Sequence, residues 1–279
     1  MQLLAPAKIN LSFEIRGRRQ DGFHEIETLM VPVSVFDRIS IERTTASDRS
    51  IQFSCDDQSI PGGDANLVVR AARSFQAATG LSGGIRIRLE KSIPHGAGLG
   101  GGSSDAASTL RGLNELFGGV LGNADLSKLA AELGSDVPFF LAHSAASCRG
   151  RGEIVEPVPF AARLKLLLLK PDFGVPTPWA YGRWKDAKEL PGIDYTGQMF
   201  DGVRFINDLE RPVFEKFVIL AQLKTWLRRQ PEVAVALMSG SGSTIFAALR
   251  DGADSAAISN RVRMEVDPML WTAPCESVN

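Results

Sequence analysis

Histidine and cysteine are scarce in this chain, and neither is spaced for metal binding. The 279 residues include three histidines and three cysteines. Cys55, Cys148 and Cys275 lie far apart in the sequence and are odd in number, so they make neither a zinc pattern nor a disulfide framework. These absences exclude a disulfide-stapled domain and a histidine–cysteine metal site, and they indicate a reducing compartment.

The chain also lacks a charge excess of one sign and a long hydrophobic run. The formal net charge is −1, which argues against a nucleic-acid partner. The longest apolar run, residues 164–169 interrupted by Lys165, is far too short to span a membrane. Because strand character begins directly after Met1, we expect no signal or transit peptide, no membrane partner and a cytoplasmic protein.

What the chain does have is a glycine-rich stretch between a strand pattern and a helix start. Apolar and charged residues alternate over 85–90, which is typical of a half-buried strand. Residues 94–105 read Pro-His-Gly-Ala-Gly-Leu-Gly-Gly-Gly-Ser-Ser-Asp, with a helix start at Ala106. Glycines let backbone N–H groups turn onto a phosphate, and a helix N-terminus adds unpaired donors and partial positive charge. The expected ligand is a nucleotide phosphate.

Two well-known nucleotide loops fit this stretch poorly. A Walker loop ends in Gly-Lys-Ser/Thr, whereas here Ser103 follows Gly102 directly. Residues 96–101 match the Rossmann pattern G-x-G-x-x-G, but that motif requires a second parallel strand ending in an acidic residue. The segment 125–133 is helical in pattern instead, so an oxidoreductase is the weaker alternative.

Hydrophobic patterns along the chain predict mixed strands and helices. Strands are expected over 9–15, 29–35, 38–43, 51–54 and 164–169, with a strand–loop–strand at 233–249. Helices are expected from Asn66 to Gly80, from Asp125 to Gly134, and around Phe214, Phe217, Ala221 and Trp226. Because no regular βαβ rhythm is present, we expect an α+β fold. Proline and charge cluster over 155–163, which predicts two domains, residues 1–158 and 159–279.

The glycine stretch resembles the phosphate loop of the superfamily that includes galactokinase, homoserine kinase and mevalonate kinase. That loop reads Pro-x-x-x-Gly-Leu-Gly-Ser-Ser-Ala, matched here at Pro94, 98–100 and 103–104 with two extra glycines. The lengthened loop is similar to the branch acting on 4-diphosphocytidyl-2-C-methyl-D-erythritol in non-mevalonate isoprenoid biosynthesis. The resemblance implies a two-domain, ATP-dependent small-molecule kinase, as a monomer or weak homodimer.

The resemblance also implies an ATP site. Its expected residues are Asn66, Lys91, Pro94, Gly96, Gly98, Leu99, Gly100, Gly101, Gly102, Ser103 and Ser104. Asn66 and Lys91 match positions near adenine. Magnesium is expected mainly on the phosphates, so no protein metal ligand is assigned and Ser104 is only a candidate. His95 departs from the superfamily pattern and has no assigned role.

Two charged residues match catalytic positions of the superfamily. Lys8 lies among apolar residues of a strand pattern, where a lysine is ordinarily solvated. Asp136 follows a helix end, ordinarily a turn position, but precedes Val-Pro-Phe-Phe, so we expect a protected place. Phosphoryl transfer to an alcohol needs a carboxylate within reach of the acceptor hydroxyl. The resemblance implies Asp136 in that role, with Lys8 offsetting charge beside it.

A third group of residues matches an acceptor site. The resemblance implies that Phe23 and Tyr181 sandwich a cytosine ring while His24 hydrogen-bonds its edge. Phe23 stands where the family more often has tyrosine, so it keeps the stacking and loses a hydroxyl contact. The remaining expected acceptor residues are Asn10, Thr177 and Gly240, the last in the glycine motif 238–244.

Two further alternatives stay open. A related kinase for homoserine or mevalonate lacks the base sandwich, so binding of a cytidine nucleotide discriminates it. A non-catalytic ligand sensor on the same fold is favoured by loss of Lys8 or Asp136, and both residues are present.

Overall fold

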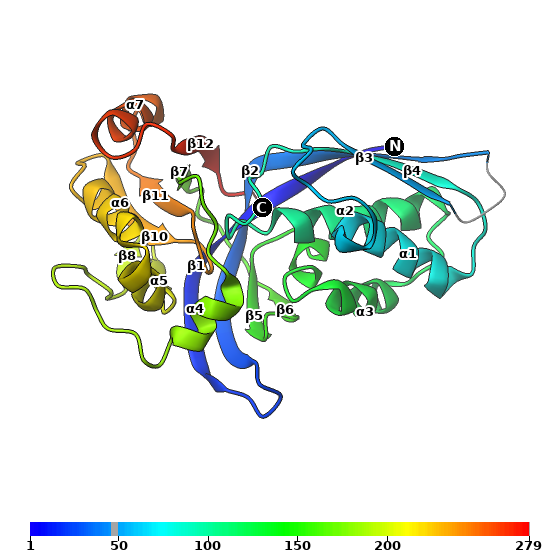
Figure 1. Cartoon of the computed structure of the whole chain (residues 1–279), viewed down its shortest axis with the longest axis horizontal. Coiled ribbons are helices and arrows are strands. Elements are labelled where there is room, and N and C mark those ends of the chain that lie inside the picture. Colours follow the sequence, from blue (N-terminus) through cyan, green and yellow to red (C-terminus); the bar gives the residue numbers. More distant parts are fainter. Residues whose placement is uncertain (46–49, 279) are drawn as a thin grey trace.

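The protein contains two β-sheets in the computed structural model, which describes residues 1–45 and 50–278 (Figure 1). The larger sheet contains β1 (Gln2–Arg18), β2 (His24–Arg43), β3 (Ile51–Cys55), β4 (Ile85–Glu90), β5 (Ala146–Gly150), β6 (Ile154–Pro157), β8 (Gln198–Phe200) and β9 (Val203–Asn207). The smaller sheet contains β7 (Lys165–Lys170), β10 (Val233–Met238), β11 (Ile245–Leu249) and β12 (Trp271–Glu276). The α-helices are α1 (Leu67–Thr79), α2 (Gly101–Leu116), α3 (Asn123–Leu133), α4 (Thr177–Arg183), α5 (Glu210–Lys216), α6 (Val218–Arg228) and α7 (Ser255–Glu265). The expected α+β class is confirmed.

The larger sheet runs in the order β3-β4-β2-β1-β9-β8, with β5 and β6 continuing from the other end of β2. The long antiparallel strands β1 and β2 connect the two halves of the molecule, and α1, α2 and α3 lie together on one side of this sheet (Figure 1). Phe75 of α1 and Leu110 of α2 pack with Ile41 and Ile87 of the sheet in one apolar core. Burying each such side chain contributes about 1.5–3 kcal/mol.

The smaller sheet runs in the order β10-β11-β7-β12 and packs against α6 and α7. Leu167 and Leu169 of β7 share a core with Leu223 of α6 and Val262 of α7. The alternate residues of β7, such as Leu166 and Leu168, face a different core that includes Ile9 of β1. β7 is therefore buried on both faces, and this second core joins the two sheets.

Local sequence signals were correct at some helix ends and wrong at others. The Val68 N–H donates to the Asn66 side chain (2.8 Å), and Gly80 ends α1 with φ +68°, as predicted. Asp125 is not the α3 N-cap, as we expected, because Gly122 holds that position. Asp125 lies instead in the first turn, where a carboxylate still favours the helix dipole.

Two element predictions were also wrong. The strands expected over 29–35 and 38–43 are one strand, β2, because a register shift opposite Pro6 and Ala7 absorbs the irregularity as a bulge. The helix expected around 214–226 is two helices, since Phe217 leaves helical geometry with ψ 69° between α5 and α6.

β8 and β9 follow residue 158 but belong to the larger sheet, where β9 pairs in parallel with β1. The larger sheet thus includes strands from both sides of residue 158, and the division into domains 1–158 and 159–279 stays a prediction. Over residues 1–45 and 50–278, no helix is both long and apolar enough to cross a membrane.

Candidate active site

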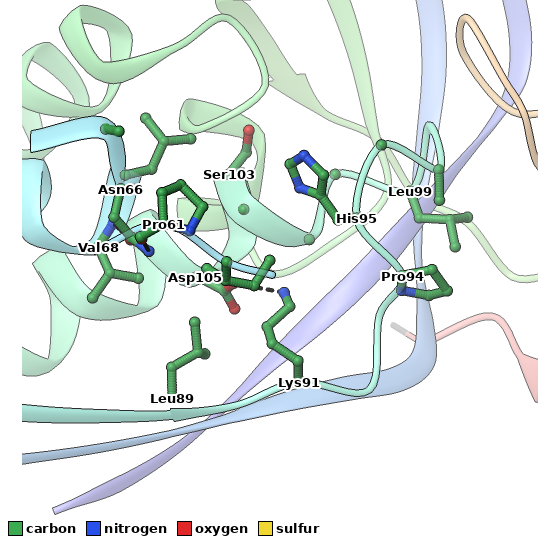
Figure 2. Close-up of a pocket in the computed structure, with 18 of the residues that line it drawn as sticks. Pro61, Asn66, Val68, Leu89, Lys91, Pro94, His95, Leu99, Ser103 and Asp105 are labelled. Carbon is green, nitrogen blue, oxygen red and sulfur yellow. Dashed lines mark hydrogen bonds and ion pairs between the residues drawn. The ribbon is translucent and has the colours of Figure 1, made fainter. Parts of the chain in front are cut away.

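The glycine-rich loop connects β4 to α2 and forms one wall of a cavity of about 300 Å³, which we call the loop cavity (Figure 2). Gly96, Gly98 and Gly100 have φ between +64° and +74°, a left-handed region that favours glycine. Gly100 is the N-cap of α2, so the first N–H groups of that helix open beside the loop. The geometry suits an anion placed against the loop.

Predicted ATP residues gather on this cavity. It is lined by Asn66, Lys91, Pro94, Gly96, Gly98, Leu99, Gly100, Gly101, Gly102 and Ser103, together with Leu67, Val68, Leu89, His95 and Asp105. Ser104, also predicted to bind ATP, does not line this cavity, because its side chain is fully buried. Among the described residues, its hydroxyl has no hydrogen-bond partner.

Lys91 is held in a buried cluster with two carboxylates at the edge of the loop cavity. Its ammonium group points at Asp105, with Nζ 2.9 Å from Oδ2 (Figure 2), and it also bonds Asp37 Oδ2. The other oxygen of Asp37 accepts the backbone N–H groups of Ser92 (2.6 Å) and Ile93 (2.9 Å). The cluster thus ties β2, the start of the glycine loop and α2 together.

Charge balance in this cluster makes Asp105 titrate unusually. Burial raises the pKa of Asp105 to about 7, and the negative charge of Asp37 adds to the rise against the pull of Lys91. Burial lowers the pKa of Lys91, but the neighbouring Asp105 and Asp37 raise it by more, so the net shift is upward. The cluster thus contains one ammonium group and two acids. A proton retained on Asp105 below neutral pH balances the cluster.

We therefore expect Asp105→Asn to flatten the pH dependence of stability. The ordinary pKa of an aspartate is 3.8, so as pH rises from there toward about 7 the unfolded chain loses the Asp105 proton before the folded protein does, and the free energy of unfolding falls. The slope from this group is at most about 1.4 kcal/mol per pH unit. Urea unfolding at about pH 5 and about pH 8 should show a smaller difference in the variant than in the wild type. Equal differences would contradict the assignment.

Lys8 and Asp136 face each other across a second cavity of about 180 Å³, the central cavity. Lys8 lies on β1 in the middle of the larger sheet and is only 3% exposed, contrary to the solvated position ordinary for lysine. Its Nζ donates to Asn10 Oδ1 at 2.6 Å and lies 3.6 Å from Asp136 Oδ2. Asn10 is fixed in turn by donating to Thr28 Oγ1 at 2.8 Å. The lysine therefore has a defined position.

Asp136 lies between α3 and a 3₁₀ turn, Pro138–Leu141, whose proline and aromatic residues are buried. Its side chain is 36% exposed, so a substrate can reach the carboxylate. The backbone N–H of Lys8 donates to the Leu99 carbonyl at 2.9 Å, which fixes the glycine loop beside this pair. A carboxylate and an ammonium group thus meet where the loop ends.

A third and larger cavity of about 720 Å³, the outer cavity, holds the predicted base-binding residues. The rings of His24 and Tyr181 stack with centroids 5.2 Å apart, and Phe23 is 51% exposed at the same cavity. Burial lowers the pKa of His24, and Arg18 and Lys185 lower it further. The imidazole is therefore neutral at pH 7, with one nitrogen donating and the other accepting.

The three cavities share walls and form a series. Gly96, Gly98 and Gly100 line both the loop cavity and the central cavity. The residues common to the central and outer cavities are Asp136, Arg151, Thr177 and Tyr181. A molecule in the loop cavity and another in the outer cavity would therefore meet at Lys8 and Asp136.

The second glycine motif, between β10 and β11, closes this site from the other half of the molecule. The hydroxyl of Ser239 donates to the Gly98 carbonyl at 3.0 Å, and the Thr244 N–H donates to the Ala97 carbonyl at 3.2 Å. The Asn207 side chain donates to the Gly240 carbonyl at 2.8 Å. Gly240 lines the central cavity, as do Asn10 and Thr177.

Sequence reasoning missed Asp37, Thr28 and Arg151, which contact or line the site. None carries a local sequence signal that links it to the site. Asp37, for example, bonds Ile93 across 56 positions.

Comparison with known proteins identifies the family. Residues 66–144 match the model for the GHMP kinases N-terminal domain, and residues 198–266 match the GHMP kinases C-terminal model. The 4-diphosphocytidyl-2-C-methyl-D-erythritol kinase of Methylacidiphilum infernorum is 45% identical over 245 residues, 87% of this chain and 84% of that protein. This chain belongs to the 4-diphosphocytidyl-2-C-methyl-D-erythritol kinase family.

Other members of this kinase family are similar over comparable lengths. The kinase of Synechococcus is 39% identical over 268 residues, 88% of this chain and 87% of its own. A crystal structure of 4-(cytidine 5'-diphospho)-2C-methyl-D-erythritol kinase matches with a TM-score of 0.80 and 35% identity over the whole of both chains. A homoserine kinase from Cytophaga hutchinsonii, at 18% identity and a TM-score of 0.69, shares the fold, covering 100% of this chain and 94% of its own. The expected superfamily and fold are thus confirmed.

Proposed function

We propose that this kinase transfers the γ-phosphoryl group of ATP to a hydroxyl of 4-diphosphocytidyl-2-C-methyl-D-erythritol, a step in non-mevalonate isoprenoid precursor biosynthesis. The observation that carries the proposal is the series of three cavities with Lys8 and Asp136 at the middle one. Membership in the family supports the acceptor, since its named relatives are kinases of that molecule.

ATP binds with its adenosine part in the loop cavity, near Asn66 and Lys91, and its phosphates along residues 96–104. Left-handed glycines and the α2 N-terminus present N–H groups to the phosphate oxygens. Since the same glycines form a wall of the central cavity, the γ-phosphoryl group faces Lys8. In-line transfer then needs positioning and charge stabilisation more than covalent help from the protein.

Asp136 accepts a hydrogen bond from the attacking hydroxyl and orients it or takes its proton. The buried ammonium group of Lys8 offsets negative charge that develops between donor and acceptor. Asn10 holds that ammonium in place through its 2.6 Å bond. Both groups thus act at the central cavity.

The site fits a magnesium ion held mainly by ATP. Over the described residues, no group of three or more histidine, cysteine, aspartate or glutamate side chains could hold a metal. Magnesium is commonly bound by substrate phosphates with one or two protein ligands, and here it would neutralise charge on the ATP phosphates. The unpartnered hydroxyl of Ser104 is the candidate protein contact.

The outer cavity receives the cytidine end of the acceptor. Its aromatic residues Phe23 and Tyr181 offer stacking faces, and the neutral imidazole of His24 offers a donor and an acceptor to the base edge. Thr177 and Gly240, on the wall of the central cavity, lie toward the reacting end. The whole acceptor thus spans two adjoining cavities.

Truncating Tyr181 tests the cytidine site. We expect Tyr181→Ala to weaken acceptor binding by about 1–3 kcal/mol, or roughly tenfold to hundredfold, because one stacking face is lost. Tyr181→Phe keeps the ring and should bind almost as the wild type does. ATP affinity should barely change, since Tyr181 does not line the loop cavity. Acceptor and ATP titrations of both variants measure these differences.

His24→Ala separates base reading from stacking. We expect weaker discrimination between the cytidine and uridine forms of the acceptor, because the edge contact disappears while Tyr181 remains. If Tyr181→Ala and His24→Ala both bind the acceptor like wild type, the assignment of the outer cavity as the cytidine site is wrong. A kinase of the superfamily with another acceptor would then be favoured.

A further inference from the structure

Residues 207–210 read Asn-Asp-Leu-Glu and connect β9 to α5 beside the central cavity. Leu209 lines that cavity, but Asn207 and Glu210 line none of the three cavities and are only 5% and 1% exposed. Neither of these polar side chains has a role in the proposed transfer. Burying such groups is unfavourable unless they are hydrogen-bonded, so their partners show what they hold in place.

The Asn207 side-chain amide binds the second glycine motif, residues 238–244, at two of its carbonyl groups. Its Nδ2 donates to the Met238 carbonyl at 2.7 Å and to the Gly240 carbonyl at 2.8 Å. Its Oδ1 accepts the backbone N–H of Leu209 at 2.8 Å. Both N–H donors of the amide and its carbonyl oxygen are thus engaged, which fixes the orientation of the side chain.

Glu210 binds the same motif through its first residue. Its Oε1 accepts the Met238 N–H at 2.9 Å, so both backbone polar groups of Met238 are bonded to residues 207–210. Its Oε2 accepts from Lys224 Nζ at 2.5 Å, and both of these side chains are buried. A substitution at Glu210 would leave a buried ammonium group without its carboxylate partner, which is strongly destabilising. Asn207 is therefore the residue whose loss separates positioning from folding.

Asp208 fixes these residues to β1, the strand that carries Lys8 and Asn10. The Asp208 N–H donates to the Phe13 carbonyl at 2.9 Å, and its Oδ2 accepts the Ile15 N–H at 2.7 Å. Residues 207–210 thus bond β1 on one side and the second glycine motif on the other. Their hydrogen bonds resist a shift of the motif relative to β1.

The second glycine motif passes close to the charged pair at the central cavity. A Cβ atom at Gly240 would lie 3.3 Å from Asn10 Oδ1 and 3.4 Å from Lys8 Nζ. Gly240 has a left-handed φ of +55°, which favours glycine, and it lines the central cavity. A displacement of this backbone would therefore change the surroundings of the Lys8 ammonium group directly.

We propose that Asn207 is a positioning residue for phosphoryl transfer, which holds the second glycine motif against Lys8 and Asn10. The inference rests on the proposed function. Because Asn207 lines none of the three cavities, it acts through the Gly240 carbonyl and not by contact with ATP or acceptor. A misplacement of about 1 Å can lower a rate about 10²-fold, so its loss should appear in kcat more than in ligand binding.

Turnover per ligand-binding site in Asn207→Asp tests the inference. Aspartate has the same size and can still accept the Leu209 N–H, but it loses both donors and faces two carbonyl groups. We expect kcat to fall about tenfold to hundredfold, with KM for the acceptor nearly unchanged. Calorimetric titration with CDP counts the folded sites, since the cytidine end is proposed to bind in the outer cavity. Asn207→Ala should show a smaller loss, because it introduces no charge.

Gln198→Glu is the matched control. Gln198 is also buried, and its Nε2 donates to the Ala236 carbonyl of β10 at 3.0 Å, two residues before Met238. It lines none of the three cavities and does not contact the second glycine motif. The substitution makes the same change from amide to acid against the same strand. It should lower the Tm as Asn207→Asp does but keep the wild-type kcat per CDP-binding site.

The outcomes separate a positioning role from a structural one. If Asn207→Asp keeps the wild-type kcat per CDP-binding site, or loses no more than Gln198→Glu, the residue only stabilises the fold and the inference is overturned. The inference also fails if neither Asn207 variant yields CDP-binding protein while Gln198→Glu does. In each case, an active wild type leaves the proposed function standing. A wild type that does not phosphorylate the acceptor contradicts the proposed function itself, and the inference with it.

Discussion

Asp136→Asn should lower kcat by about 10²–10⁴-fold while leaving ATP binding nearly intact. The substitution keeps the shape of the side chain and removes the carboxylate that can take or orient the hydroxyl proton. ATP binding should persist because Asp136 does not line the loop cavity. The ammonium of Lys8 keeps its bond to Asn10, so the variant should fold. Steady-state kinetics and an ATP titration measure the two effects.

Asp186→Asn provides a matched control for this loss. Asp186 is an exposed carboxylate that lines the outer cavity but not the central one. Its loss should leave kcat close to wild type, because it lies away from Lys8. Wild-type turnover in Asp136→Asn would rule out the assigned role.

Gly98→Ala should be nearly as damaging, because this glycine is where the two glycine loops touch. A Cβ at this position would overlap the Ser239 carbonyl oxygen and lie 2.9 Å from the Gly242 carbonyl oxygen. The left-handed φ of +74° adds a second penalty for any L side chain. Overpacking and strain together cost about 2–5 kcal/mol in the present loop conformation. The loop must shift to relieve this cost, which displaces its N–H groups, so we expect kcat/KM for ATP to fall more than about tenfold.

Gly96→Ala separates close approach from dihedral strain. Gly96 has a similar φ of +64°, but the nearest atom to a Cβ there lies 3.9 Å away. It should therefore cost only the strain and retain more activity than Gly98→Ala. Nucleotide affinities, with circular dichroism to confirm folding, make the comparison. Equal ATP affinity in Gly98→Ala and wild type would count against the loop as the phosphate site.

Short-range signals predicted the elements that local chemistry determines. Asn66 caps α1, Gly80 ends it, and the 85–90 alternation forms β4. The errors arose where tertiary packing decides. A bulge lets β2 continue through a stretch that reads as two strands, and Phe217 breaks a pattern that reads as one helix. Such features depend on partners that periodicity does not reveal.

The residues of the site also fall into those that a local sequence pattern reveals and those that only the fold brings together. The glycine loop is visible as a local pattern, but Lys8 and Asp136 are 128 positions apart and needed the family resemblance to be paired. Burial of Lys8 follows from its place in the middle of the larger sheet, which no local pattern contains. Arg151 matches no motif, and only the fold brings it to the central and outer cavities. Asp37 matches no motif either, and only the fold brings it to Lys91.

ATP consumption by the wild-type kinase across a panel of acceptor alcohols tests the assignment most directly. The panel contains 4-diphosphocytidyl-2-C-methyl-D-erythritol, the same polyol without its cytidine diphosphate group, homoserine and mevalonate. We predict rapid consumption with the first acceptor and little with the other three, because only the first fills the central and outer cavities together. Consumption with homoserine or mevalonate, and none with the cytidine diphosphate ester, would contradict the proposed function.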